Sequence, residues 1–103
     1  MKDLPRFHPS VPYDLAEAIA WYEDISVDVA NRFRIAVRSA FSKVRSQPLT
    51  YGVAFDDVRI VRVARFPYLV QFRMRAEVPF VLGVFHSASN PDKWHKRARK
   101  DAR

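Results

Sequence analysis

Five arginines share two neighbouring apolar segments of this chain, and they are the residues best suited to chemistry. The stretch from Arg59 to Arg75, "RIVRVARFPYLVQFRMR", contains no acidic residue. Arginine carries a permanent charge on a planar fork of N–H donors, which binds phosphate and carboxylate oxygens in pairs. The stretch therefore indicates contact with a polyanion, contact with an acidic protein, or solvation of one face of a sheet.

A second polar group follows the next apolar segment, where the chain reads "HSASNPDKWHKR" from His86. Metal-free cleavage of RNA needs cations that stabilise the phosphorane and one group that moves a proton. Histidine titrates near neutral pH, and an aromatic ring can stack on an unpaired base. For such a reaction we predict the catalytic residues Arg62, Arg65 and His86, and the RNA- or target-binding residues Arg59, Arg73, Arg75, Trp94 and Arg97.

Each of these residues also has a structural interpretation. A histidine at the end of an apolar strand commonly bonds to the backbone, and Trp94 can equally pin the C-terminal segment to a sheet. The arginines of the strands and of the basic tail can simply solvate a surface. Residue types alone predict a basic domain that binds something acidic, and they leave both interpretations open.

Length and composition predict one domain over residues 1–103. Nearly half of the residues are apolar (49%), which is typical of a chain that buries its own core. The absence of cysteine excludes disulfides and thiolate metal sites. No apolar run reaches the roughly 20 residues of a membrane span, and the opening "MKDLPRFHPS" has no hydrophobic segment of the signal-peptide kind. We expect a soluble, cytoplasmic protein.

The motifs of common cofactor and metal enzymes are missing from the sequence. Only two glycines are present, Gly52 and Gly83, and neither belongs to a phosphate-binding loop pattern. The three histidines are too far apart for a metal site, and no G-x-S-x-G motif occurs. We therefore predict no cofactor and no metal.

The net charge of +7 is unevenly distributed along the chain. Six of the eleven acidic residues lie between Asp3 and Asp28, whereas the last eleven residues, "KWHKRARKDAR", contain six Lys or Arg and one acid. A basic surface attracts nucleic acid through counterion release, and it attracts acidic proteins equally. Charge alone does not choose between these partners.

Two amphipathic helices are predicted in the first half of the chain. Ser10 is a candidate N-cap before Pro12, and Ser26 and Pro48 are the expected start and stop of the second helix. The predicted apolar stripes are Leu15, Ala18, Ile19, Tyr22 and Ile25 in the first helix and Ala30, Phe33, Val37, Ala40, Phe41 and Val44 in the second. The short connection predicts an antiparallel hairpin.

Beyond the second helix, the apolar period changes to two residues, which indicates strands. In "YLVQFRMR" the alternation places Arg73 and Arg75 on the same face. In "VRIVRVARF" the spacing places Arg59 and Arg65 on one face and Arg62 on the other.

The remaining segments complete a predicted α+β fold. "RFHPS" is expected to be a short edge strand and "PFVLGVFH" a strand that is covered on both faces or central in the sheet, while "NPDKWHKRARK" predicts a turn followed by a short basic helix or a frayed tail. We therefore expect an N-terminal antiparallel helix hairpin packed on one face of a small, mainly antiparallel sheet. The second face, with Arg73 and Arg75, must be wet or occupied.

Taken in order, these segments resemble the RelE/ParE superfamily of toxins from bacterial type II toxin–antitoxin modules, of the plasmid-stabilisation type. The resemblance covers nearly the whole chain. It rests on "FHPSVPYDLAEAIAWYED" for the first strand and helix, and on "ANRFRIAVRSAFSKVRSQP" for the second helix. It rests further on "VRIVRVARFPYLVQFRM" for the arginine-bearing strand, the Phe-Pro-Tyr turn and the next strand, and on "VFHSASNPDKWHKR" for the terminal strand, histidine, turn and tryptophan.

The resemblance implies a RelE-like fold and a growth-inhibiting toxin, which an acidic antitoxin neutralises by masking its basic surface. It also implies one of two targets. RelE-like members cut messenger RNA in the ribosome without a metal, whereas ParE-like members poison DNA gyrase. Contact with operator DNA would be indirect, through the antitoxin, and no membrane is involved.

The chain departs from the ribonuclease pattern of this superfamily at three positions. Ribonuclease members tend to carry an arginine where this chain has Leu69, and many relatives carry another where it has Ser89. The tyrosine or histidine often found near the C-terminus is replaced by Trp94, with His95 beside it. A leucine and a serine cannot stabilise a phosphorane, so we expect a ParE-like or unassigned target. The alternatives are a ribosome-dependent mRNA endoribonuclease and a non-toxic co-repressor with the toxin fold.

Overall fold

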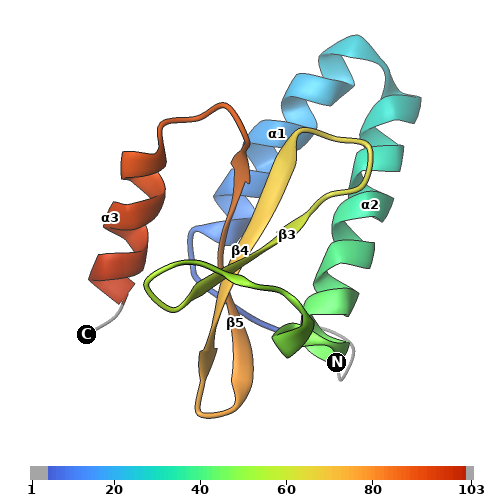
Figure 1. The fold of residues 1–103 in the computed structure, drawn as a ribbon. Coiled ribbons are helices and arrows are strands. Elements are labelled where there is room, and N and C mark those ends of the chain that lie inside the picture. The colour runs from blue at the N-terminus through green and yellow to red at the C-terminus, as the bar shows by residue number, and fades with distance from the viewer. Residues whose placement is uncertain (1–4, 102–103) are drawn as a thin grey trace.

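A five-stranded mixed sheet and three helices form the fold of the computed structural model, which describes residues 5–101 (Figure 1). The strands are β1 (Arg6–Phe7), β2 (Val53–Phe55), β3 (Val58–Arg62), β4 (Tyr68–Arg75) and β5 (Val78–His86). Their order in the sheet is β1-β5-β4-β3-β2. Strands β2 to β5 pair antiparallel, and β1 lies parallel to β5 at one edge. The predicted α+β class, the short edge strand and the inner position of "PFVLGVFH" are confirmed.

The helix hairpin covers one face of this sheet. Helices α1 (Val11–Ile25) and α2 (Val27–Ser46) are separated only by Ser26, whose extended backbone reverses the chain. The Ser26 hydroxyl accepts a hydrogen bond from Val29 N at 3.3 Å and caps α2, as predicted. Helix α2 ends before Pro48, which opens a short 3-10 turn.

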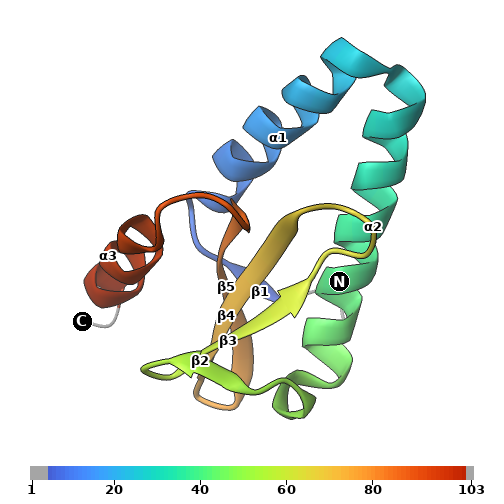
Figure 2. The ribbon, with the colours of Figure 1, turned by 45° about the horizontal axis from the view of Figure 1, so that its top comes forward.

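Two details of α1 differ from the prediction. Ser10 occupies the N-cap position, but its side chain makes no capping bond, and its carbonyl instead accepts from the backbone N–H groups of Tyr13 and Asp14. Ile25 is 63% exposed and does not belong to the buried stripe. The reason is visible in Figure 2, where the tip of the hairpin extends past the ends of the strands.

The main core lies between the hairpin and the sheet. All six residues of the predicted α2 stripe are buried there. Phe33 has no exposed surface. Its ring centroid lies 5.0–5.2 Å from those of Tyr22, Phe66 and Tyr68. Burying a side chain of this size contributes roughly 1.5–3 kcal/mol, so this aromatic cluster fixes the hairpin on the end of the sheet where β4 begins.

The other face of the sheet is covered by α3 (Pro91–Asp101), which lies on the side away from α2 (Figure 1). Asn90 Oδ1 accepts from Asp92 N at 3.0 Å and caps the start of α3. Ala98 is buried in a small second cluster with Leu82. The basic segment is therefore a helix and not a frayed tail. It occupies the part of the second face that carries Arg73, whereas Arg62 and Arg75 stay exposed.

The prediction for "VRIVRVARF" is wrong at its C-terminal end. Strand β3 ends at Arg62, and Arg65 lies in the turn before β4 with a φ of 71°. This is the left-handed region, so Arg65 shares no strand face with Arg59. Arg59 pairs with Phe72, on the hairpin side. Arg62 pairs with Leu69, so Arg59 and Arg62 lie on opposite faces, as predicted.

Candidate functional site

The three predicted catalytic residues lie at one end of the sheet but do not converge. Arg62 ends β3, His86 ends β5, and Arg65 lies in the turn that joins β3 to β4. His86 pairs with Tyr68, whereas Arg62 pairs with the next residue of β4, Leu69. Successive residues of a strand point to opposite faces, so Arg62 faces α3 and His86 faces the hairpin. The sheet therefore separates this cation from the predicted proton carrier.

Hydrogen bonds to the backbone hold His86 in one tautomer. Its Nδ1 accepts from Ala88 N at 3.0 Å, and its carbonyl accepts from the Ser89 N–H at 3.0 Å and from the Ser89 hydroxyl at 2.6 Å. Its ring meets the Tyr68 ring edge-on at 5.1 Å. With Nδ1 as an acceptor, the neutral ring carries its proton on Nε2. His86 can therefore donate from Nε2, but it can take up a proton only by giving up the bond to Ala88.

Arg62 and Arg65 are available cations at this end of the sheet. Both are exposed, and neither makes an ion pair with another residue in the described range 5–101. Arg59 differs from them, because its Nη1 donates to the carbonyl of Tyr51. An external anion can reach Arg62 and Arg65 without breaking an internal salt bridge, so their contact with a target remains a prediction.

Arg73 is a buried structural arginine. Its Nε and Nη2 donate to the Asp57 carboxylate at 2.8–3.1 Å. Its Nη1 donates to Asp101 at 3.0 Å and to the Ala98 carbonyl at 2.9 Å. The hydrogen bonds from Arg73 lower the pKa of Asp57 below its ordinary value. The side chain is only 7% exposed, so Arg73 joins the β2–β3 turn to α3 and offers no free surface to a target.

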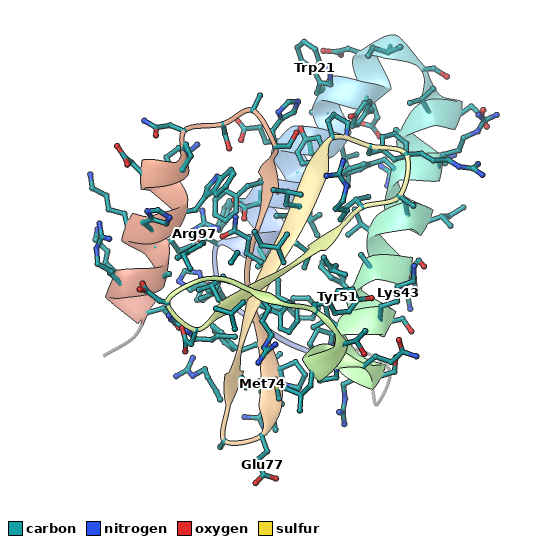
Figure 3. The ribbon with its side chains drawn as sticks, viewed as in Figure 1. Trp21, Lys43, Tyr51, Met74, Glu77 and Arg97 are labelled. Carbon is teal, nitrogen blue, oxygen red and sulfur yellow. The ribbon has the colours of Figure 1, made fainter. Side chains whose placement is uncertain are left out.

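Arg97 of α3, labelled in Figure 3, joins α3 to α1 beside a bulge in β5. Its guanidinium pairs with Asp14 at 2.6 Å and lies 4.7 Å over the Phe85 ring. It also donates to the Leu82 carbonyl at 3.1 Å. The register of β4 and β5 shifts at Leu82, and Val84 N donates to Asp14 at 3.0 Å. One aspartate therefore binds both α3 and the bulged strand.

The other predicted binding residues also contact the chain itself. Arg75 lies 4.4 Å over the Phe80 ring and is half exposed. Trp94 packs against Phe85 at 5.9 Å, and its indole N–H donates to Ser89 Oγ at 2.9 Å. Trp94 therefore pins α3 to β5, which is the structural role that the sequence predicted as the alternative to base stacking.

Sequence reasoning missed the three aspartates that hold these arginines. Asp14 lies 83 positions from Arg97, and Asp57 and Asp101 lie 16 and 28 positions from Arg73. No local spacing links residues so far apart. The only signal was the alternation of the strand, which placed Arg73 on a second face that had to be either wet or occupied.

A cleft of about 590 Å³ opens between α1 and α3, beside the end of β5. One wall is α1, which contributes the exposed acids Glu17 and Asp24 and the 65% exposed Trp21. Figure 3 shows Trp21 near the tip of the hairpin. The other wall carries His86 and Lys93. Sequence reasoning did not single out Trp21, because it lies off the apolar stripe of α1.

A second hollow, of about 330 Å³, is apolar and lies between α1 and α2. Ile35 projects beside it and is 70% exposed. Arg34 and Arg38 stand at its rim. We call this hollow the hairpin groove. Its apolar lining consists of Phe7, Leu15, Ile19 and Ile35, which keep exposed surface, and of Phe33, Val37 and Phe41, which are buried.

The fold and these two hollows define a basic α+β domain with an apolar groove and a polar cleft. Across residues 5–101, no group of histidine and acidic side chains could hold a metal ion, and no helix is long and apolar enough to cross a membrane. The chain matches no model of a known protein family and none of the curated proteins with which it was compared.

Proposed function

We propose that this chain is the toxin of a type II toxin–antitoxin module, with a RelE/ParE-like fold. The order of its elements supports the proposal: an edge strand, a helix hairpin, antiparallel strands that carry arginines, and a basic C-terminal helix. In this proposal the free chain inhibits growth, and an acidic antitoxin neutralises it.

The hairpin groove is the observation that carries the proposal. It offers apolar surface between two helices, and exposed Ile35 extends that surface outward. Arg38 at the rim makes no ion pair within the described part of the chain, so it is available to an acidic partner. An amphipathic acidic segment that folds on binding would bury its apolar side chains in the groove and pair its carboxylates with the rim.

The proposed target is either DNA gyrase, as for ParE-like toxins, or a target still to be assigned. The support is that Arg62 and His86 lie on opposite faces of the sheet and that Arg73 and Arg97 are engaged in ion pairs. A nuclease site needs its cations and its proton carrier around one phosphate. Ribosome-dependent cleavage of mRNA is the second candidate, because Arg62 and Arg65 are exposed cations at the same end of the sheet as His86.

The antitoxin contact is tested with Ile35→Asp and its control Leu49→Asp. The two residues are equally exposed, at 70% and 69%, and only Ile35 lines the hairpin groove. We expect Ile35→Asp to weaken binding of the acidic protein encoded beside the gene by about 2 kcal/mol or more, the scale of an interface hot spot. The free variant should still inhibit growth, and co-expression of the partner should no longer rescue it. Equal binding by both variants and the unchanged protein would contradict the proposed contact.

A further inference from the structure

The last two turns of α1 form an acidic and aromatic face on an otherwise basic protein. Glu17, Trp21, Asp24 and Ile25 follow the spacing of one helix face, and all four are exposed. From Glu17 to Asp28 the chain has four acidic residues and no Lys or Arg, although its net charge is +7. We name Glu17, Trp21, Asp24 and Ile25 the acidic α1 face.

The two acids of this face are not neutralised by the fold. The fold does neutralise the neighbouring acids. Glu23 pairs with Arg34 at 2.9 Å, and Asp28 pairs with Arg32 at 2.8 Å. Glu17 and Asp24, in contrast, make no ion pair with any other described residue. The negative charge of Glu17 also reaches into the cleft, where it contributes, after burial and Tyr22, to the raised pKa of Tyr68.

The two apolar members of the face, Trp21 and Ile25, belong to neither hydrophobic cluster of the described residues 5–101. Trp21 is 65% exposed and Ile25 is 63% exposed. Large apolar side chains that are exposed together and bordered by charge mark interaction surfaces. Trp21, Glu17 and Asp24 also line the cleft of about 590 Å³, so the face continues into a concave site.

We infer that the acidic α1 face and the cleft beside it dock a basic peptide segment of a partner protein. A Lys or Arg of that segment lies over the Trp21 indole, between the carboxylates of Glu17 and Asp24, which combines a cation–π contact with charge pairing. An apolar side chain of the segment packs against Ile25. On the opposite wall, backbone carbonyls of the segment accept from His86 Nε2–H and from Lys93.

The unpaired carboxylates of Glu17 and Asp24 disfavour an acidic antitoxin or a nucleic acid at this site, because like charges repel. Of the two cations that line the cleft, Arg97 is already paired with Asp14, so only Lys93 opposes these two charges. The inference is therefore independent of the proposed function. The hairpin groove with Arg38 would receive an acidic partner, and the acidic α1 face would receive a basic one.

The test is the affinity of a capped synthetic peptide of alternating arginine and leucine, measured by fluorescence anisotropy at about 0.15 M salt. Glu17→Gln with Asp24→Asn removes two charges from the face without changing side-chain size. The matched control, Glu23→Gln with Asp28→Asn, removes two charges from acids that α2 already neutralises. We expect the first variant to bind at least about tenfold more weakly and the control to bind within about twofold of the unchanged protein. Trp21→Ala should weaken binding to a similar extent as the first variant.

Three outcomes would overturn the inference. One is that the unchanged protein does not bind the basic peptide. Another is that both double variants lose affinity equally, which would indicate attraction to overall charge. The third is that a labelled capped peptide of alternating glutamate and leucine, or a labelled single-stranded RNA, binds the unchanged protein more tightly than it binds the Trp21→Ala variant. Failure of this experiment would leave the antitoxin contact at Ile35 untouched, because the two surfaces share no residue.

Discussion

Arg73 and Arg97 place their guanidinium groups against aspartates from distant parts of the chain. Asp57 and Asp101 hold the first, and Asp14 holds the second. A guanidinium that leaves water needs paired and hydrogen-bonded partners, and removing one partner of a buried pair costs about 3–5 kcal/mol. The arginines therefore fall into two groups. These two hold the fold, and Arg62 and Arg65 remain free for a target.

Gly83 is the residue whose identity depends most closely on one of these pairs. A Cβ at this position would overlap Arg97 Nη1 and lie 2.6 Å from the Phe85 ring. Since Asp14 fixes Arg97, we expect Gly83→Ala to destabilise the protein by about 1–3 kcal/mol, as overpacking of a core does. Thermal unfolding measures this, at about 4–8 °C per kcal/mol for a domain of this size. Gly52→Ala is the control, because a Cβ added there would meet nothing within 4 Å; equal melting temperatures for both variants would contradict the account.

At the scale of elements, periodicity predicted what local sequence determines. The α2 stripe is buried at every predicted position, because this face of α2 packs against both α1 and the sheet. The prediction that Ile25 is buried was wrong because the end of α1 extends past the strands. A periodic pattern in a helix does not show where the sheet beside it ends. The prediction that Arg65 lies on a strand was wrong because Arg65 has a positive φ and belongs to the turn after β3. The aspartate partners of Arg73 and Arg97 could not be predicted, since tertiary packing alone brings them together.

The ion pair between Asp57 of the β2–β3 turn and Arg73 of β4 should respond to pH. The pKa of Asp57 is lowered by its hydrogen bonds to Arg73. A depressed carboxyl pKa contributes stability above the ordinary value near 3.9 and loses it as pH falls through the folded value. Asp57→Asn should therefore be less stable than the unchanged protein at pH 7, and the difference should shrink as the pH falls below about 4.

Urea unfolding followed by circular dichroism over this pH range measures the effect. Asp24→Asn serves as the control, because Asp24 contacts no cation among the described residues, and its substitution should leave stability nearly unchanged at each pH. A difference between Asp57→Asn and the unchanged protein that stays constant down to pH about 2 would show that the ion pair does not contribute.

At the scale of the whole molecule, charge is segregated. The acidic α1 face carries Glu17 and Asp24, which pair with no cation among the described residues, while α3, the rim of the hairpin groove and the β3–β4 turn carry arginines and lysines. Such a distribution suits a protein with two kinds of partner, one acidic and one basic. Net charge alone, at +7, predicted only the first of these.

The most direct test of the proposed function is pulse-labelling of a bacterial host in the first minutes after the chain is induced. Thymidine incorporation reports DNA synthesis, and methionine incorporation reports translation. If the chain is a toxin with a ParE-like target, growth should stop and thymidine incorporation should fall before methionine incorporation. The variant with Arg65→Ala and His86→Ala should behave in the same way. Methionine incorporation that falls first, and recovers in that variant, would contradict this account and establish the ribonuclease alternative; undisturbed growth would contradict a toxin altogether.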